Sequence, residues 1–297
     1  MSLSDEMRNE LAAVAPEQDC DRLAELSGLF HTAGSVHLRG RGEIALHLDL
    51  AASSVARRAF ALLRAFGVES EIRTYSRRAF GRETRFQLHV SGESRAREVL
   101  HEAGVLSARF APLERPPRRV VARTCCRRAY LRGALLGSGS LSGPRAPHLE
   151  IRTATVDGAE LLASLAPLAA HDRGRHAVAY AKGVEAIADV LAAAGAVDTV
   201  LLLEEHAVMG ATRSRANRLA NADHANLVRT ARAAHTQLAA VKRLDLSTLP
   251  GELREVAELR LRYPTLSLRE LALKCEPRAT KATVHRRLRR LEELARR

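Results

Sequence analysis

Leu-Ser-Leu-Arg-Glu-Leu-Ala-Leu-Lys-Cys occupies residues 266–275, and Thr-Lys-Ala-Thr-Val-His-Arg-Arg-Leu-Arg-Arg-Leu follows at residues 280–291. Ser267 and Glu270 have the S-x-x-E spacing of a capping box, which predicts that a helix begins at Ser267. Pro277 disfavours helical conformation in the residue before it, so we expect the first helix to end at this break. The stretch therefore predicts two helices joined by a tight turn.

The second of these helices is amphipathic. Thr280 is a favourable N-cap, and Val284, Leu288 and Leu291 fall on one stripe at about 100° per residue. The opposite side is basic, as in a recognition helix that enters the major groove of DNA. A solvated arginine-rich helix on an unrelated core is the alternative, but the caps, the break and the basic face together favour a helix-turn-helix. We expect DNA contacts from Arg278, Thr280, Lys281, Thr283, His285, Arg286, Arg289 and Arg290.

Within this set the expected roles differ. Arg286 and Arg289 are placed to contact bases or phosphates, because the arginine fork fits both phosphate oxygens and the edge of guanine. Thr283 would reach a base edge. His285 lies on the flank of the basic face, where contact and no contact are equally expected. Phosphate contacts are expected from Arg278, Lys281 and Arg290.

The net charge of +13 is concentrated in parts of the chain. Residues 1–113 are neutral overall and residues 133–212 carry −4, whereas residues 114–132, 213–248 and 249–297 carry +6, +5 and +6. Clustered positive charge indicates a polyanionic partner. Arginine outnumbers lysine 43 to 4, and a GC-rich genome would explain that ratio but not the clustering. Aromatic residues are few, which argues against single-strand binding by base stacking and favours double-stranded DNA.

The cysteines are Cys20, Cys125, Cys126 and Cys275, and none has the C-x-x-C or Cys/His spacing of a metal site. Adjacent Cys125 and Cys126 make a poor structural disulfide, so we expect ordinary reduced thiols and no metal. The N-terminus lacks an apolar signal segment, and no apolar run reaches the length of a membrane span. We therefore expect a cytoplasmic, nucleoid-associated protein with no membrane partner.

The motifs of common enzymes are missing from the sequence. There is no G-x-x-x-x-G-K-[ST] phosphate loop, and the glycine-serine stretch at 137–143 is more typical of a turn. The 12 histidines form no H-E-x-x-H motif. Ser138 and Ser140 have no identifiable His/Asp partners. We expect no enzymatic activity, no cofactor and no small-molecule substrate.

The N-terminal two-thirds of the chain contain an internal repeat. Gly28 matches Gly133 and Gly34 matches Gly139, each pair at a separation of 105 residues. In each copy an apolar helix ends on the second glycine and a strand follows. Two such helices can pack backbone to backbone across a two-fold axis, which would place these glycines at an interface between two lobes. Ordinary helix C-caps are the alternative, and the recurrence favours the interface.

Other elements of the repeat correspond as well. Helix 53–66 matches helix 156–170, and helix 94–103 matches helix 184–194. The two later strands predicted in the first copy correspond to only one predicted strand in the second copy, at 175–181. The predicted fold class is α+β, with two pseudo-symmetric αββαββα lobes followed by an all-α helix-turn-helix domain. The predicted domains are a first lobe at 1–115, a second lobe at 116–212, a helical connector at 213–248 and the helix-turn-helix domain at 249–297.

The two glycine motifs resemble degenerate copies of the LAGLIDADG motif of homing endonucleases. The segment at 217–227 resembles the junction of the WhiA family of bacterial sporulation and cell-division regulators, and the segments at 267–273, 280–281 and 287–291 resemble its terminal signature. That family joins a two-lobed LAGLIDADG-like domain to a C-terminal helix-turn-helix domain. The resemblance covers nearly the whole chain, from about Cys20 to the end.

The resemblance implies a regulator rather than a nuclease. In the endonucleases each motif places an acidic residue before the final glycine, and the two carboxylates hold divalent metal between the lobes. Ala33 and Ser138 occupy these positions here, and neither offers an anionic oxygen. Other carboxylates, at Glu43, Asp49 and Glu150, lie on expected strands outside the motifs. We therefore expect no catalytic residue and no metal-dependent cleavage.

Arginines outside the terminal domain are secondary candidates. Residues 213–245 are expected to be helical, and their arginines either follow a DNA backbone or face water. The expected strands are not notably basic, so we expect the terminal domain to dominate DNA affinity while the lobes assist it or bind a protein partner. Arginines between the lobes would line the saddle on which endonuclease lobes seat DNA: Arg118, Arg119, Arg123, Arg127 and Arg128.

These observations predict a transcriptional regulator with double-stranded DNA as its partner. The resemblance points to genes for sporulation, cell division or chromosome segregation, and to a sigma factor or a second transcription regulator as a protein partner. A sequence-tolerant nucleoid-associated or protein-bridging factor is the alternative.

Overall fold

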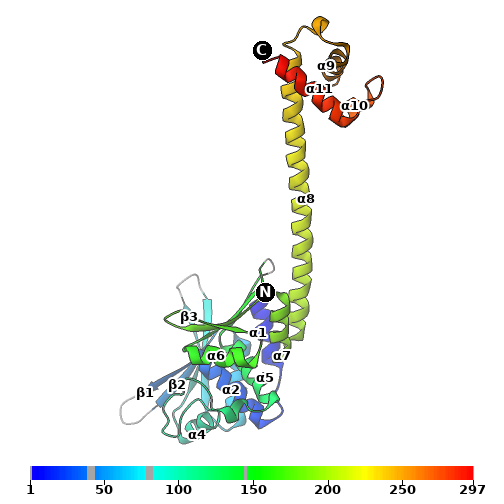
Figure 1. The fold of residues 1–297 in the computed structure, drawn as a ribbon. Helices are drawn as coiled ribbons and strands as arrows, with labels where there is room; N and C mark the ends of the chain where they lie inside the picture. Colours follow the sequence, from blue (N-terminus) through cyan, green and yellow to red (C-terminus); the bar gives the residue numbers. More distant parts are fainter. Residues whose placement is uncertain (1, 39–43, 78–82, 144–145, 297) are drawn as a thin grey trace. The chain divides into compact units, whose positions relative to one another are not determined.

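The computed structural model of the chain is shown in Figure 1 and divides into two compact units, Met1–Ala211 and Thr212–Arg297. Within the described part of the chain, no helix combines the length and the apolar character that crossing a bilayer requires. The residues that the structure describes are 2–38, 44–77, 83–143 and 146–296.

The first unit contains two lobes with the same order of elements. The first lobe consists of α2 (Asp19–Ala33), β1 (Gly34–Leu38), β2 (Ile44–Leu50), α3 (Ser53–Ala65), β3 (Ser70–Arg77), β4 (Glu83–Val90) and α4 (Ser94–Glu102). The second consists of α5 (Thr124–Ser138), β5 (Gly139–Ser142), β6 (His148–Thr153), α6 (Val156–Leu165), β7 (Ala169–Asp172), β8 (Ala177–Lys182) and α7 (Val184–Ala194). The antiparallel sheets have the orders β1-β2-β4-β3 and β5-β6-β8-β7. The predicted αββαββα arrangement is confirmed in both lobes.

Each sheet has one buried face and one open face, because side chains alternate along a strand. In β2, Leu46 and Leu48 are fully buried, whereas His47 between them is half-buried on the other face. In β6, Leu149 and Ile151 are likewise fully buried on one face of the sheet. Burying each of these side chains contributes about 1.5–3 kcal/mol, so the alternation fixes which face of the sheet packs on the helices.

Helices α2 and α5 pack against each other along their length at the centre of this unit (Figure 1). Their closest approach is at two glycines. A Cβ atom on Gly28 would collide with the backbone carbonyl of Tyr130, and one on Gly133 would collide with the carbonyl of Glu25. Any larger residue at either position would push the two helices apart.

Gly34 and Gly139 have a different role from the other two glycines. Each follows the last residue of its helix with φ of −84° or −62°, which is an extended and not a left-handed conformation. A Cβ atom at these positions would meet the carbonyls of Phe30 and Leu135 in the last turn of the same helix. They therefore permit a direct passage from helix to strand.

A buried ion network crosses between the lobes beside the glycine contact. The fully buried Glu25 of α2 pairs with Arg58 of α3 at 2.7 Å and with Arg132 of α5 at 2.8 Å. Both carboxylate oxygens are used, so the charge of Glu25 is satisfied without water.

The N-terminal helix α1 (Leu3–Ala13) belongs to the first part of the chain but contacts the second lobe. The Ser4 hydroxyl donates to the carbonyl of Leu141 at 3.0 Å and accepts from its N–H at 2.8 Å. The Glu10 carboxylate accepts from the N–H groups of Asp198 and Thr199, at 2.7 and 2.8 Å, in the first turn of α8 (Val197–Val241). A carboxylate is favourable there because free N–H groups and the helix dipole make a helix N-terminus positive.

The second unit is entirely helical in its described residues, as predicted. After the C-terminal part of α8 come a 3-10 turn, η3 (Leu246–Thr248), and the helices α9 (Gly251–Arg262), α10 (Leu268–Leu273) and α11 (Lys281–Leu294). Val241 at the end of α8 is buried in the same core as the three short helices. The other fully buried residues of this core are Val256, Ala257, Leu271, Val284, Leu288 and Leu291.

Two local predictions differ from the structure. Helix α6 ends at Leu165 and not at residue 170, because strand β7 follows it. The four residues of β7 are all exposed, so no alternation of apolar and polar residues predicts the strand. The stretch at 137–143 is not a turn: its first two residues complete α5, and Gly139–Ser142 form β5. Helix α8 is continuous from Val197 to Val241, and the division between the two compact units falls within it, after Ala211.

Candidate nucleic-acid interface

Helix α11 presents one face to solvent because its opposite face is fixed in the core. Val284, Leu288 and Leu291 are fully buried. The Thr280 hydroxyl accepts from the N–H of Thr283 at 3.1 Å, which confirms the predicted N-cap. The buried stripe determines the rotation of the helix about its own axis, and therefore which side chains face outward.

The outward face is basic. Among the described residues, no ion pair involves Arg286 or Arg289, so both guanidinium groups are available to a ligand. Arg290 lies 3.0 Å from the carboxylate of Glu293 in an exposed pair, which a phosphate could replace at little cost. The exposed members of the predicted set are Arg278, Thr280, Lys281, His285, Arg286, Arg289 and Arg290.

Arg287 lies on the other side of the helix. Its guanidinium group pairs with Glu252 at 2.7 Å and with Glu255 at 3.6 Å, both on α9. These contacts attach α11 to α9 and neutralise the charge of Arg287. The structure thus separates arginines with a structural role from arginines that face solvent within one four-residue stretch.

The two threonines of the predicted set are engaged at the start of the helix. Thr283 is half-buried, and its hydroxyl lies 2.9 Å from that of Thr280. A base contact by Thr283 would have to share or replace this hydrogen bond. Their local role is therefore to begin α11, and any DNA contact comes in addition.

The first helix of the motif has the predicted capping box. The N–H of Ser267 donates to the Glu270 carboxylate at 2.8 Å, and the N–H of Glu270 donates to the Ser267 hydroxyl at 3.3 Å. The bond from the Ser267 backbone holds the pKa of Glu270 below its usual range. Helix α10 ends at Leu273, earlier than Pro277 requires.

Two exposed cations near α10 were missed by the reasoning from sequence. Arg269 lies on α10 and Lys274 follows its last residue, with the Lys274 ammonium 4.5 Å from the centre of the Tyr263 ring. In a helix-turn-helix the first helix crosses the DNA backbone, so exposed cations there are suited to phosphates. Their position in or directly after the helix before the turn at Pro277 could have predicted them from the sequence.

A buried arginine supports this domain from within. Arg260 of α9 is 2% exposed, and it donates to the side-chain oxygen of Gln237 at 2.9 Å and to the carbonyl of Leu266 at 2.7 Å. Burial lowers the pKa of Arg260. The contacts tie the end of α8 to the turn before α10. No local pattern distinguishes Arg260 from the exposed arginines around it.

The middle of α8 carries exposed arginines. The expected connector is helical up to Val241, and its candidate cations are exposed, so they are suited either to a DNA backbone or to water. These residues are Arg213, Arg215, Arg218, Arg229 and Arg232.

The C-terminal ends of α2 and α5 meet where the resemblance would place two catalytic acids. Ala33 and Ser138 are the last residues of these helices. A Cβ atom on Gly137 would touch the Ala33 methyl group at 3.3 Å, so the two ends are in close contact. The Ser138 hydroxyl donates to the carbonyl of Arg152 at 2.7 Å. A methyl group and an engaged hydroxyl thus stand in place of two carboxylates.

The other candidate carboxylates of the lobes are paired. Asp49, on the open face of the first sheet, lies 2.9 Å from Arg85. Glu150, on the open face of the second sheet, lies 2.6 Å from Arg173. Glu43 lies outside the described residues. The surroundings of Asp49 and Glu150 are therefore those of ion pairs on a sheet surface.

The arginines between the lobes lie at the opposite end of the central helix pair from Ala33 and Ser138. They are in the 3-10 turn η2 (Arg118–Val121) and at the start of α5, which at 1.5 Å per residue is roughly 20 Å from its last residue. Backbone carbonyls hold three of them. Arg119 donates to His101 at 2.9 Å, Arg127 to Val121 at 3.0 Å and Arg128 to Ala193 at 3.0 Å. Arg118 and Arg123 are exposed. We therefore do not include this group in a DNA surface formed by the other end.

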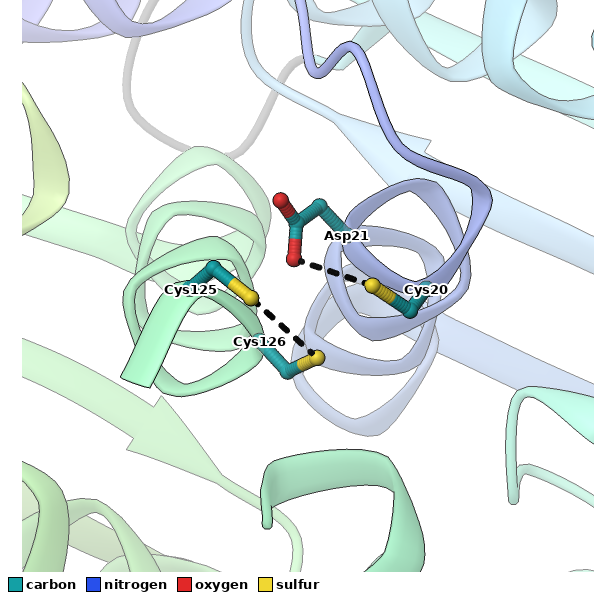
Figure 2. Close-up of side chains that lie close together, drawn as sticks. All are labelled: Cys20, Asp21, Cys125 and Cys126. Carbon is teal, nitrogen blue, oxygen red and sulfur yellow. Dashed lines mark hydrogen bonds between the residues drawn. The ribbon is translucent and has the colours of Figure 1, made fainter. Parts of the chain in front are cut away.

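Three cysteines meet in the structure (Figure 2). Cys20 and Asp21 lie in the first turn of α2, and Cys125 and Cys126 in the first turn of α5, with one ligand atom from each within 4.8 Å of all the others. The cysteines are free thiols, but the spacing of the sequence did not predict that three of them lie together. A signal was present, because Cys20 and Asp21 are separated from Cys125 and Cys126 by the same 105 residues as the paired glycines. A two-fold axis brings such equivalent positions together.

Comparison with known families gives matches in all three parts of the chain. Models described as the WhiA N-terminal LAGLIDADG-like domain, the WhiA LAGLIDADG-like domain and the WhiA C-terminal HTH domain match residues 19–106, 127–213 and 216–295.

Whole-chain relatives and a solved structure agree with these matches. Proteins named "Probable cell division protein WhiA" from Heliobacterium modesticaldum and Desulforamulus reducens are 37% and 35% identical to this chain, over 99% of it and 96% and 95% of their own lengths. The crystal structure of full-length DUF199/WhiA from Thermatoga maritima is similar in fold, with a TM-score of 0.58 at 22% identity, over 100% of this chain and 98% of that one.

Proposed function

The chain belongs to the WhiA family, and from this premise we propose that it is a transcriptional regulator that binds duplex DNA through its helix-turn-helix domain and does not cleave it. The observation that supports the proposal best is the outward face of α11, where Arg286 and Arg289 are exposed and have no acidic partner among the described residues. The relatives' names concern cell division, and we extend that role to this chain.

In the proposed complex, α11 lies in the major groove. Arg286 and Arg289 would contact base edges or phosphates, because each guanidinium fork can donate two parallel hydrogen bonds. Each phosphate contact should steepen the dependence of affinity on salt by about one logarithmic unit per tenfold change in salt concentration. Phosphate contacts would position the domain, and we assign them to Arg278, Lys281 and Arg290, with His285 and Arg269 at the edges.

The absence of cleavage is proposed from the chemistry at the ends of α2 and α5. Metal-assisted phosphodiester hydrolysis needs anionic oxygens that hold the cation against the scissile phosphate. Ala33 and Ser138 supply none. Asp49 and Glu150 are paired with arginines on the sheets. Magnesium-dependent nicking that is lost on mutating either carboxylate would contradict this part of the proposal.

The proposed targets are promoters of genes for sporulation, cell division or chromosome segregation, with a sigma factor or a second regulator as a protein partner. The alternative is a nucleoid-associated or bridging factor that binds DNA without a fixed site. The exposed arginines of α8 favour it, because cations along a helix can contact the phosphates of a DNA backbone whatever its sequence. A protected footprint at one promoter, in an excess of competitor DNA, supports the regulator. Uniform protection supports the alternative.

The deciding experiment compares two double variants with the same loss of charge. Arg286→Ala with Arg289→Ala removes the two exposed cations of α11, whereas Arg57→Ala with Arg64→Ala removes two exposed cations of α3. We expect the first variant to lose about 1–3 kcal/mol of discrimination between the bound promoter and unrelated DNA, measured by competition binding. The second should bind like the wild type. Equal losses in both would mean that the net charge alone drives binding.

A further inference from the structure

We propose that Cys20, Asp21, Cys125 and Cys126 form a structural zinc site that joins the first turns of α2 and α5. Three thiols and one carboxylate from two helices converge there, as Figure 2 shows, and in the described residues this is the one group of three or more Cys, His, Asp or Glu side chains close enough to share an ion. Thiolates with a carboxylate as fourth ligand are a donor set that suits Zn²⁺.

The two distances between neighbouring ligands agree with those of a tetrahedral site. Zinc bonds of about 2.3 Å to sulfur and about 2.0 Å to oxygen place two sulfurs about 3.8 Å apart and a sulfur and an oxygen about 3.5 Å apart. The sulfurs of Cys125 and Cys126 are separated by 3.9 Å, and Cys20 Sγ lies 3.6 Å from an oxygen of Asp21. The largest separation, 4.8 Å, is also too short for a polynuclear iron–sulfur cluster, whose ligands surround several metal atoms.

The surroundings favour anionic ligands once a cation neutralises their mutual repulsion. Bound zinc would do so, because it binds thiolates and releases their protons. The N-termini of α2 and α5 both add positive potential. Cys20 and Cys126 line an adjacent hollow of about 480 Å³, together with Arg119. A cation and solvent can therefore reach the thiols through this hollow.

The role inferred is structural. Four protein ligands close a tetrahedral shell and leave no open position for a substrate or water. The ligands come in equal number from the two lobes, so the ion would join them at the end of the helix pair opposite Ala33 and Ser138. Removing it should loosen the pair at its N-terminal end without touching the helix-turn-helix unit.

The test uses full-length, tag-free protein purified with a non-thiol reductant and no chelator. We expect about one zinc ion per chain by mass spectrometry of the metal. After chelation, titration with cobalt chloride should give a thiolate-to-cobalt charge-transfer band and tetrahedral d–d bands that saturate at one equivalent. The double variant with Cys20→Ser and Cys126→Ser should lack the charge-transfer band. Asp21→Asn should keep this band but alter the d–d bands. Cys275→Ser is the matched control, since Cys275 is a buried thiol in the other unit.

Two results would overturn the proposal. The first is the absence of a charge-transfer band when cobalt is added to folded, reduced wild-type protein, a result that does not depend on whether any variant folds. The second is a band that persists when Cys20 and Cys126 are both replaced, because the metal would then be bound elsewhere. Circular dichroism establishes that each variant is folded before its spectrum is interpreted.

Discussion

The central helix pair α2–α5 and the terminal helix α11 use charge in opposite ways. In the pair, Glu25 is fully buried and both of its oxygens pair with arginines from other helices. In α11 the buried stripe is apolar, and the cations Arg286 and Arg289 face solvent. The difference separates architecture from recognition. In the helix pair, buried ion pairs help to hold the two lobes together. In α11, the apolar stripe and the Arg287 ion pairs fix the helix, and the cations that take no part in these contacts are available to a ligand.

The sharpest way to break this comparison is Glu25→Ala. It leaves two arginines, Arg58 and Arg132, without their shared carboxylate, and breaking a buried ion pair in this way costs about 3–5 kcal/mol. We expect the lobes to lose that stability in chemical denaturation followed by hydrogen exchange, while peptides from α9 to α11 keep their protection.

The matched control for this prediction is Glu71→Ala. Glu71 pairs with Arg73 at 2.7 Å but on the exposed surface, so its loss should leave the stability of the lobes unchanged. If both substitutions have equal effects, the buried network contributes nothing particular to the lobe interface.

A smaller effect is expected from pH, through His31. Burial lowers the pKa of His31 to about 4 from an ordinary value of 6.5, although its Nδ1 lies 2.8 Å from the carbonyl of Ser27. The unfolded chain therefore takes up this proton first as pH falls. The contribution of neutral His31 is complete above about pH 6.5 and is lost towards pH 4, in total about 3 kcal/mol.

The measurement is the stability of the lobes between pH 7 and pH 4 in the wild type and in His31→Gln. The variant should show a shallower loss over this range, because the other titrating groups are common to both proteins. Parallel curves would show that His31 is protonated in the folded protein at little cost.

The smallest of these effects is expected in the second unit, from Thr280→Ala. The substitution removes the hydroxyl that accepts from the N–H of Thr283, and losing an N-cap typically costs about 1 kcal/mol. We expect hydrogen exchange to show a lower stability of the helix-turn-helix unit and an unchanged stability of the lobes. Thr280→Ser keeps the acceptor and should restore the wild-type value. A loss of similar size with serine would assign the effect to the methyl group instead.

Sequence reasoning reached the features that depend on neighbouring residues. The capping box at Ser267, the N-cap at Thr280 and the apolar stripe of α11 are all local patterns, and each is present. The repeat also predicted the order of elements in both lobes. Strand β7 was missed because its four residues are exposed, so no alternation marks them.

The parts that could not be predicted depend on contacts between distant segments. Nothing near Arg260 or Arg287 distinguishes them from the solvent-facing arginines, since their partners Gln237 and Glu252 come from other helices. The DNA contacts of the exposed arginines stay a prediction. The cysteine group is an intermediate case, because its residues lie far apart in sequence but share the separation of the glycine pairs.

The constant separation of 105 residues between facing positions on α2 and α5 has an evolutionary consequence. A residue near the axis has its duplicated counterpart as a neighbour, so a substitution in one copy changes the environment of the other. Across related sequences, we expect Gly28 to co-vary with Gly133, and Cys20 with Cys125 and Cys126. Each half of the duplication would then constrain how far the other can diverge.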